Sequence, residues 1–253
     1  MAKKTTEVQE STALAPTSGY AALAANDLMA ELQEDLTGLT LRYDRIKIPS
    51  ANSPVFEVPS EEGESEMAQE LRGVIILQHP ANSYYKEQYT GGSNPPDCGS
   101  YDGITGSTGQ ECATCPYNVF GSGQGQSKAC KNKRMLYLLP EGELFPQMFC
   151  VPTGSLKEFS QYLKRQLSKG RRLSQVVTKI SLKKATSSSG IAYSQCVFTC
   201  ERVLEAAEQA AIAPVIEQAK AYAASLTVAQ MAQITEDDQM VDPATGEVIE
   251  ALN

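Results

Sequence analysis

The stretch NSYYKEQYTGGSNPPDCGSYDGITGSTGQECATCPYNVFGSGQGQSKACKNKRMLYLLPEGELFPQMFC, residues 82–150, decides how the rest of the chain is interpreted. Most of it is dense in Gly, Ser, Asn and Pro, which break helices and strands. Four of the seven cysteines lie between residues 98 and 130. A loop of this length without regular structure is unusual in a compact domain unless something holds it. A bound metal ion would hold it.

The cysteine spacing C-x13-C-x2-C-x14-C contains one metal knuckle, CATC at residues 112–115. Two thiolates at C-x2-C spacing reach the same side of a tight turn, where they can bind one ion. We therefore predict a structural Zn²⁺ site with no open position for a catalytic water, made of Cys98, Cys112, Cys115 and Cys130. An iron–sulfur cluster on the same thiolates and ordinary reduced cysteines are the alternatives. Disulfides are disfavoured by the odd count and by the absence of a secretory signal.

Strands dominate the middle of the chain, where apolar residues alternate with polar ones or form short runs. They are predicted at residues 41–50, 54–59, 70–78, 133–139, 144–151, 174–184 and 191–200. The acidic segment 60–70 is predicted as an exposed loop or short helix. These strands and the large loop predict an α+β fold, mainly antiparallel β: an OB-like Greek-key barrel with a zinc loop at residues 82–134. A split sheet with helices on one side is the alternative.

Three helices are predicted, at residues 18–36, 156–169 and 201–226. The second begins with the capping box Ser155 and Glu158, and the third contains Pro214, which predicts a kink. Polar or acidic composition predicts disorder in residues 1–17 and in the tail 227–253. The organisation is therefore one domain, residues 18–226, between two disordered ends.

The net charge of −8 conceals an asymmetry. Residues 1–70 carry −8, residues 71–200 carry +8 and residues 201–253 carry −8. The densest basic part, residues 128–184, holds thirteen Lys and Arg against three Glu. A basic field of this kind attracts polyanions such as nucleic acid, although a solvated lysine-rich surface is the plainer interpretation.

Tyrosines lie beside the basic residues at the start of the loop. Aromatic rings with neighbouring cations are used to stack unpaired bases and hold the backbone; packing over the loop is the alternative role. We predict base stacking by Tyr84, Tyr85, Tyr89 and Tyr101. We predict phosphate contacts by Lys86, Lys128, Lys131, Lys133, Arg134, Lys179 and Lys183.

Signals for catalysis are lacking in the sequence. His79 is the single histidine, and it is interpreted as a strand-end residue rather than as a metal ligand that replaces a cysteine. No nucleophile elbow, Walker loop or dinucleotide fingerprint occurs. The longest apolar run, residues 74–77, is too short to span a membrane, and the first residues lack a signal peptide. We predict a cytoplasmic, non-enzymatic protein.

The combination of YTGGSNPPDCGSYDG, CATCPYNVFGSG and KACKNKR with the basic middle resembles single-stranded-DNA-binding proteins of phages and bacterial mobile elements. The resemblance covers roughly residues 71–200. It implies an OB barrel, a zinc insertion and binding of single-stranded DNA in replication or recombination. It also implies that other replication or recombination proteins dock to the acidic tail. The alternative is a zinc-stabilised adaptor or inhibitor of a host complex that binds no nucleic acid.

Overall fold

A computed structural model describes residues 19–24, 35–37, 41–48, 53–60, 65–87, 96–123, 125–186, 190 and 192–226. Both predicted disordered ends, residues 1–17 and 227–253, lie outside these ranges. So does most of the helix predicted at residues 18–36, of which the structure shows the 3-10 helix η1 (Gly19–Ala24). Within these ranges, no helix combines the length and the hydrophobicity needed to cross a bilayer.

Seven strands of the described chain form one sheet in the order β1-β7-β6-β4-β8-β9, with β5 paired to β4. Their bounds are β1 (Arg45–Ile46), β4 (Glu70–Tyr84), β5 (Cys98–Ser100), β6 (Lys131–Leu139), β7 (Gln147–Val151), β8 (Val176–Thr186) and β9 (Ala192–Val203). Neighbouring strands are antiparallel except β1 and β7, which are parallel. The predicted α+β class with mainly antiparallel strands is confirmed.

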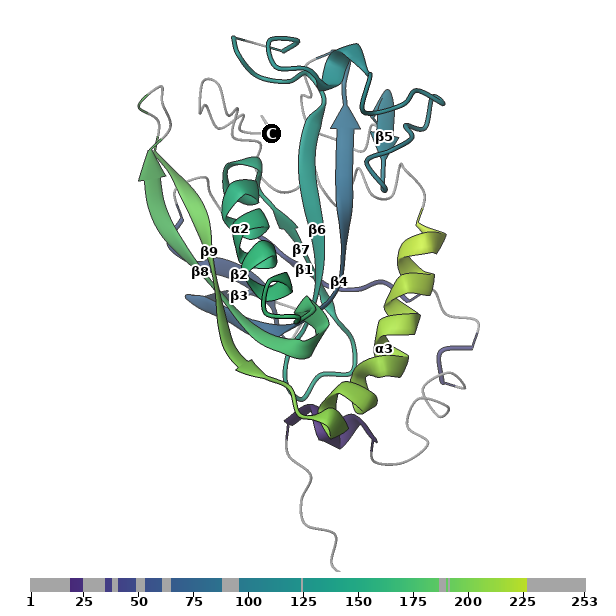
Figure 1. Ribbon diagram of the computed structural model, residues 1–253, viewed down its shortest axis with the longest axis vertical. Coiled ribbons are helices and arrows are strands. Elements are labelled where there is room, and N and C mark those ends of the chain that lie inside the picture. Colours follow the sequence, from purple (N-terminus) through teal and green to yellow (C-terminus); the bar gives the residue numbers. More distant parts are fainter. Residues whose placement is uncertain are drawn as a thin grey trace, which may run out of the picture.

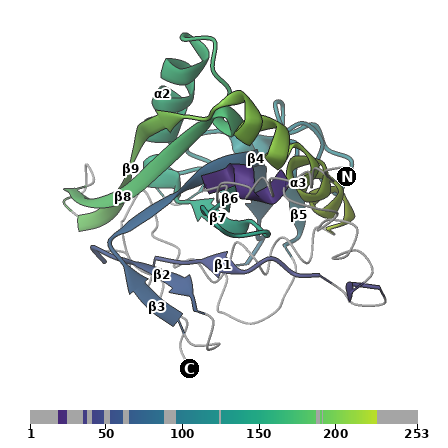
Figure 2. The same cartoon turned by 90° about the horizontal axis from the view of Figure 1, so that it is seen from below.

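Two α-helices lie on opposite faces of this sheet. The sheet curls into a half barrel around α2 (Leu156–Leu167), which Figure 1 shows between the β8–β9 and β4–β6 hairpins. On the outer face, α3 (Ala206–Ser225) runs beside β4 and packs on η1. Seen from below, η1 lies against the end of α3, which closes this face of the sheet (Figure 2). Three further 3-10 turns are η2 (Pro116–Asn118), η3 (Thr153–Ser155) and η4 (Leu173–Gln175).

The apolar run of β6 shows why both faces need a cover. Met135, Tyr137 and Leu139 lie in the core under α3 and η1, whereas Leu136 and Leu138 lie in the core around α2. All five are at most 1% exposed. Because successive side chains of a strand point to opposite faces, a continuous apolar run requires a strand that is buried on both.

A second, two-stranded sheet pairs β2 (Phe56–Pro59) with β3 (Ser65–Ala68). The predicted loop or short helix at residues 60–70 is therefore wrong for residues 65–68, which form β3, and residues 61–64 lie outside the described ranges. The β3 sequence SEMA has no apolar pattern. Its backbone nevertheless forms the hydrogen-bonded ladder with β2, whose first residue, Phe56, is fully buried.

Strands β4 and β9 extend beyond their predicted C-terminal ends. β4 continues past Gln78 to Tyr84, passing through Pro80 where β4 pairs with β6 and with neither β8 nor β5. A proline is tolerated where one edge of a strand carries no ladder. β9 likewise continues to Val203, so the C-terminal helix begins at Ala206 and not at residue 201, with Pro214 inside it as predicted.

The predicted capping box of α2 is wrong. Ser155 makes no cap; its Oγ accepts the backbone N–H of Cys196 on β9 at 2.8 Å, and its side chain is fully buried. Farther along the same strand, Ser194 Oγ donates to the carbonyl of Ser53 at 2.5 Å. β9 is the last strand in the order of the described sheet, so no further strand pairs with its outer edge. The Ser155 side chain and the Ser53 carbonyl form hydrogen bonds with β9 there instead.

Candidate nucleic-acid interface

The candidate interface lies where β4 and β6 leave the core and enter the Cys-rich loop. There Ala81, Asn82 and Ser83 pair with Lys133, Asn132 and Lys131, and β5 adds a third strand on the other side of β4. The Asn132 amide donates to Asn82 Oδ1 at 3.0 Å across the ladder. The predicted loop at residues 82–134 therefore begins and ends inside strands, which fixes its two ends.

Hydrogen bonds to the Asp102 side chain fold the first part of the loop. Asp102 Oδ1 accepts from the N–H of Ile104 at 2.7 Å, the N–H of Thr105 at 3.0 Å and the hydroxyl of Ser100 at 2.9 Å. These bonds hold the pKa of the Asp102 carboxyl below its usual value, the Ile104 N–H contributing most. The carboxylate is thus a structural part of the turn.

The loop gathers its four predicted ligands. The pKa of the Cys130 thiol is raised to about 12, first by burial and then by the thiols of Cys112, Cys115 and Cys98 nearby. Cys112 and Cys130 are 8% exposed, and the other two are half-buried. As they stand, no three His, Cys, Asp or Glu side chains of the described residues are arranged to hold a metal ion.

The surroundings of Cys98 fit a metal-loop thiol. Thr108 Oγ1 donates to Cys98 Sγ at 3.5 Å. Burial raises the pKa of the Cys98 thiol, but the hydrogen bonds from Thr108 and Ser107 together outweigh it, so that the pKa lies below its usual value. A Cβ on Gly106 would lie 2.6 Å from Cys98 Sγ, so this position requires glycine. Hydrogen bonds to the sulfur stabilise the thiolate, the form that binds a metal.

His79 takes no part in this cluster. Its Nδ1 donates to the carbonyl of Pro80 at 2.8 Å, and its Nε2 lies 3.3 Å from the hydroxyl of Tyr137. Burial lowers the pKa of His79, so the imidazole is neutral at pH 7. Both ring nitrogens are engaged within the domain, but His79 lies inside β4 and not at a strand end as predicted.

The four predicted stacking tyrosines occupy different environments. The Tyr84 ring stacks on Tyr117 of η2, with centroids 4.0 Å apart and planes at 15°. Tyr101 packs against the core under α3, edge-on to His79, and burial raises its pKa to about 12. Tyr85 is half-buried, and Tyr89 lies outside the described residues.

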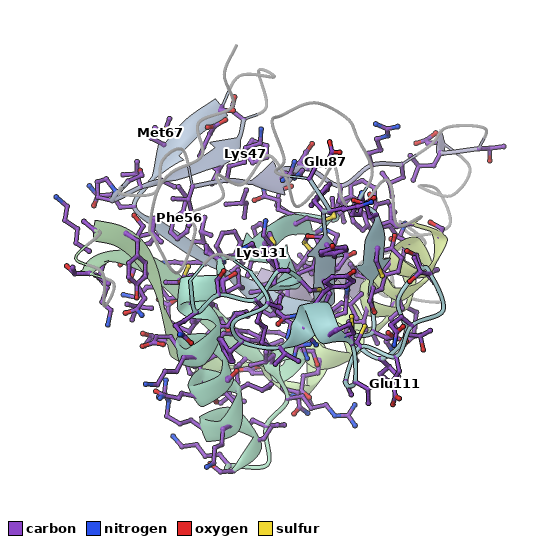
Figure 3. All side chains as sticks on the ribbon, turned by 90° about the horizontal axis from the view of Figure 1, so that it is seen from above. Lys47, Phe56, Met67, Glu87, Glu111 and Lys131 are labelled. Carbon is purple, nitrogen blue, oxygen red and sulfur yellow. The ribbon has the colours of Figure 1, made fainter. Side chains whose placement is uncertain are left out.

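Four of the predicted phosphate contacts lie around the end of the β4–β6 hairpin. Lys86 is exposed, whereas Lys131, Lys133 and Arg134 are half-buried. Burial lowers the pKa of Arg134. Figure 3 looks down on this end and shows Glu87 above and Glu111 below Lys131, both to its right in the view. The hairpin end therefore carries both signs of charge, with Lys131, Lys133 and Arg134 on β6 and Lys86 just past the end of β4.

The remaining three predicted cations are separated from one another. Lys128 Nζ donates to Asn118 Oδ1 at 3.0 Å and Asn132 Oδ1 at 3.2 Å, so it braces the loop. Lys179 forms an ion pair with Glu70 at 3.2 Å on the β4–β8 ladder. Lys183 is exposed near the free end of the β8–β9 hairpin.

Sequence reasoning missed the exposed apolar face of the loop. Its residues are solvent-accessible over nearly half or more of their surface: Ile104 (64%), Tyr117 (45%), Val119 (55%) and Phe120 (76%). The only sequence signal was their position in a glycine-rich segment with no periodicity, where an apolar residue has no core to enter.

No protein-family model matches the chain, and searches of curated proteins and of solved structures give no match.

Proposed function

We propose that the protein binds single-stranded DNA in the replication or recombination of a phage or mobile element, in the cytoplasm and without catalysing a reaction. The observation that carries this proposal is the position of the β4–β6 hairpin end. There Lys131 and Lys133 pair with Ser83 and Ala81, close in the chain to Tyr84, whose ring stacks on Tyr117, and Lys86 follows Tyr84 by two residues. Cations beside aromatic rings are the chemistry with which proteins hold single strands.

The strand order supports an OB-like interpretation of the half barrel. Strands β4, β6 and β7 form a meander, α2 follows, β8 returns beside β4, and β9 pairs with β8. This is the connectivity of an OB barrel opened between its third and fifth strands. The first-to-second connection of such a barrel is then the Cys-rich loop, and the fourth-to-fifth follows Lys183. Those two connections border the binding surface of OB-folds.

Zinc is part of this proposal as a structural group. Cys98, Cys112, Cys115 and Cys130 would bind one Zn²⁺ through four thiolates, a closed set that stabilises a loop and offers no catalytic position. Two backbone bonds tie the same cysteines to the aromatic side of the loop. The Cys130 N–H donates to the Tyr117 carbonyl at 2.8 Å, and the Asn118 N–H donates to the Cys115 carbonyl at 3.0 Å. Metal binding would therefore fix Tyr117.

Fluorescence anisotropy with a labelled oligothymidine tests the DNA proposal. We expect binding to the single strand that weakens steeply with salt, because each neutralised phosphate releases counterions, and weaker binding to a duplex of equal length. Absence of binding at low salt, both for the full chain and for a chain that ends at residue 226, would contradict the proposal. The truncation removes competition by the acidic tail.

Metal analysis of matched cysteine variants tests the zinc proposal. We expect one Zn²⁺ per chain in the native protein, loss of the metal in Cys115→Ser, and full retention in Cys200→Ser, which changes a half-buried thiol on β9. Equal zinc content in the two variants would contradict the assignment. Visible absorption of the freshly purified protein distinguishes an iron–sulfur cluster on the same thiolates.

A second function is favoured by the aliphatic residues of the loop. Ile104 and Val119 are more than half exposed, and exposed apolar side chains often mark protein-binding surfaces. A zinc-stabilised adaptor or inhibitor of a host complex would use this surface and the acidic ends. That function predicts that deletion of residues 227–253 abolishes partner binding and that oligonucleotides are ignored.

A further inference from the structure

Phe120 is held in solvent by the structure around it. Its side chain is 76% exposed, the largest value among the large hydrophobic residues that the structure describes. An exposed phenylalanine forgoes about 1.5–3 kcal/mol that burial would contribute. Its exposure therefore needs either an occupant or a reason that keeps it from folding inward.

The neighbouring segments fix the position of this ring. Ser122 Oγ donates to the Val119 carbonyl and accepts the N–H of Ala129 at 3.0 Å, so it ties together the two sides of the turn. The N–H groups of Gly121 and Gly123 both donate to the Ser127 carbonyl at 3.0 Å. The loop thus presents Phe120 from a hydrogen-bonded turn.

A cation and an aromatic pair accompany the ring. Lys128 Nζ lies 5.0 Å from the Phe120 centroid and is oriented by Asn118 and Asn132. Three residues before Phe120, Tyr117 is 45% exposed and stacks on Tyr84. We call Tyr84, Tyr117, Phe120 and Lys128 the loop platform. It combines flat apolar faces with a fixed positive charge.

We propose that the loop platform binds an unpaired nucleobase on the exposed face of Phe120. This inference rests on the proposed function and assigns it a contact that the predicted tyrosines do not include. The Lys128 ammonium group lies over the Phe120 ring, where its positive charge can attract the phosphate of the bound nucleotide. A base brings an aromatic face for Phe120 and an anionic backbone for the lysine, whereas an apolar peptide would satisfy only the ring.

A tryptophan probe tests the contact directly. The chain has no tryptophan, so Phe120→Trp creates a single indole that can be excited apart from the eleven tyrosines. Stacked bases quench indole fluorescence. We expect saturable quenching by oligothymidine with the same midpoint as the anisotropy titration. Leu167→Trp is the control, because Leu167 is 55% exposed on α2, away from the loop, and should not respond.

Truncation of the ring gives an independent measurement. Loss of one stacked base costs about 1–3 kcal/mol, so Phe120→Ala should weaken oligothymidine binding about 5- to 150-fold with an unchanged melting temperature. Two results would overturn the inference while the proposed function stands: unchanged affinity of Phe120→Ala, or unquenched Phe120→Trp in a chain that binds the oligonucleotide. Absence of binding by the native chain would instead remove the proposed function itself, and the inference with it.

Discussion

The two halves of the β4–β6 ladder follow opposite rules. In the core half, Val74 pairs with Leu139 and Ile75 with Leu138, and all four are at most 1% exposed. In the loop half, β6 begins with Lys131, Asn132, Lys133 and Arg134, each half-buried. The same two strands thus contribute first to the domain interior and then to a polar, charged extension.

The difference shows what the covering elements do. In the core half, side chains of α2 lie in the cluster on one face, and those of α3 and η1 lie in the cluster on the other. The strand pair then continues past the core and, with β5, forms a three-stranded extension. In this extension, lysine side chains and a hydrogen bond between the Asn82 and Asn132 amides take the place of apolar contacts. Burial of apolar side chains stabilises the core half of the sheet. The polar extension buries few such side chains, so we infer that it serves a function other than stabilising the domain.

The largest expected effect separates the two halves by stability. Leu136→Ala in the core half should lower the free energy of unfolding by about 2–5 kcal/mol, because it leaves a cavity among residues that cannot close it. Lys131→Ala in the loop half should change it by less than about 0.5 kcal/mol. Urea denaturation measures both. Similar losses in the two variants would show that the loop half is part of the core.

Those parts of the fold in which local pattern and tertiary context agree were predictable from the sequence. The strands predicted at residues 133–139 and 144–151 are observed as the paired β6 and β7, and in the strand predicted at residues 174–184 Ile180 lies in the core around α2 while Val177 lies in the opposite core. The strand β3 was missed because its role depends on a partner strand and not on its own pattern. The hydroxyl of Ser155 was misassigned because a backbone group 41 residues away competes for it.

A charged network secures the core half from the side opposite the loop. Both carboxylate oxygens of Glu208 accept from the Arg202 guanidinium, at 2.7 and 2.8 Å, and one also accepts the Glu205 N–H. The Arg202 side chain and, to a lesser degree, the Glu205 N–H hold the pKa of Glu208 below its usual value. Glu208 is 6% exposed, so this network joins β9 to the start of α3 in a nearly buried place.

The second prediction concerns pH. Glu208→Gln should lower the free energy of unfolding by about 1–2 kcal/mol at pH 7, discounted because the Arg202 side chain is 39% exposed. A depressed carboxyl pKa stabilises the fold above the unfolded-state value of about 4.3, and this contribution is lost as the pH falls through the lower folded value. The difference between native and variant should therefore shrink below about pH 4. A difference that is constant from pH 7 to pH 3 would contradict it.

The candidate site was predictable only in its composition. The cysteine spacing singled out four thiols of one loop, no three of which are arranged to hold a metal ion among the described residues, and the basic run coincides with the start of β6. Burial could not be read from residue type: the Tyr101 ring packs on the core while Phe120 points to solvent. Which aromatic residue leaves the loop depends on the hydrogen bonds of Ser122 and Ser127, and no local sequence pattern encodes these bonds.

The smallest expected effect tests whether the charge of the loop half has a use. Lys131→Ala should reduce the slope of log affinity against log salt for oligothymidine by about 0.7, because one phosphate contact of a single strand is lost. Lys157→Ala, an exposed lysine on α2, is the control that carries the same change of net charge. If both variants shift the slope equally, the oligonucleotide responds to the overall field of the protein and not to the hairpin end. If Lys131 alone matters, the ladder is divided as the burial suggests: apolar pairs build the domain, and its basic continuation binds the strand.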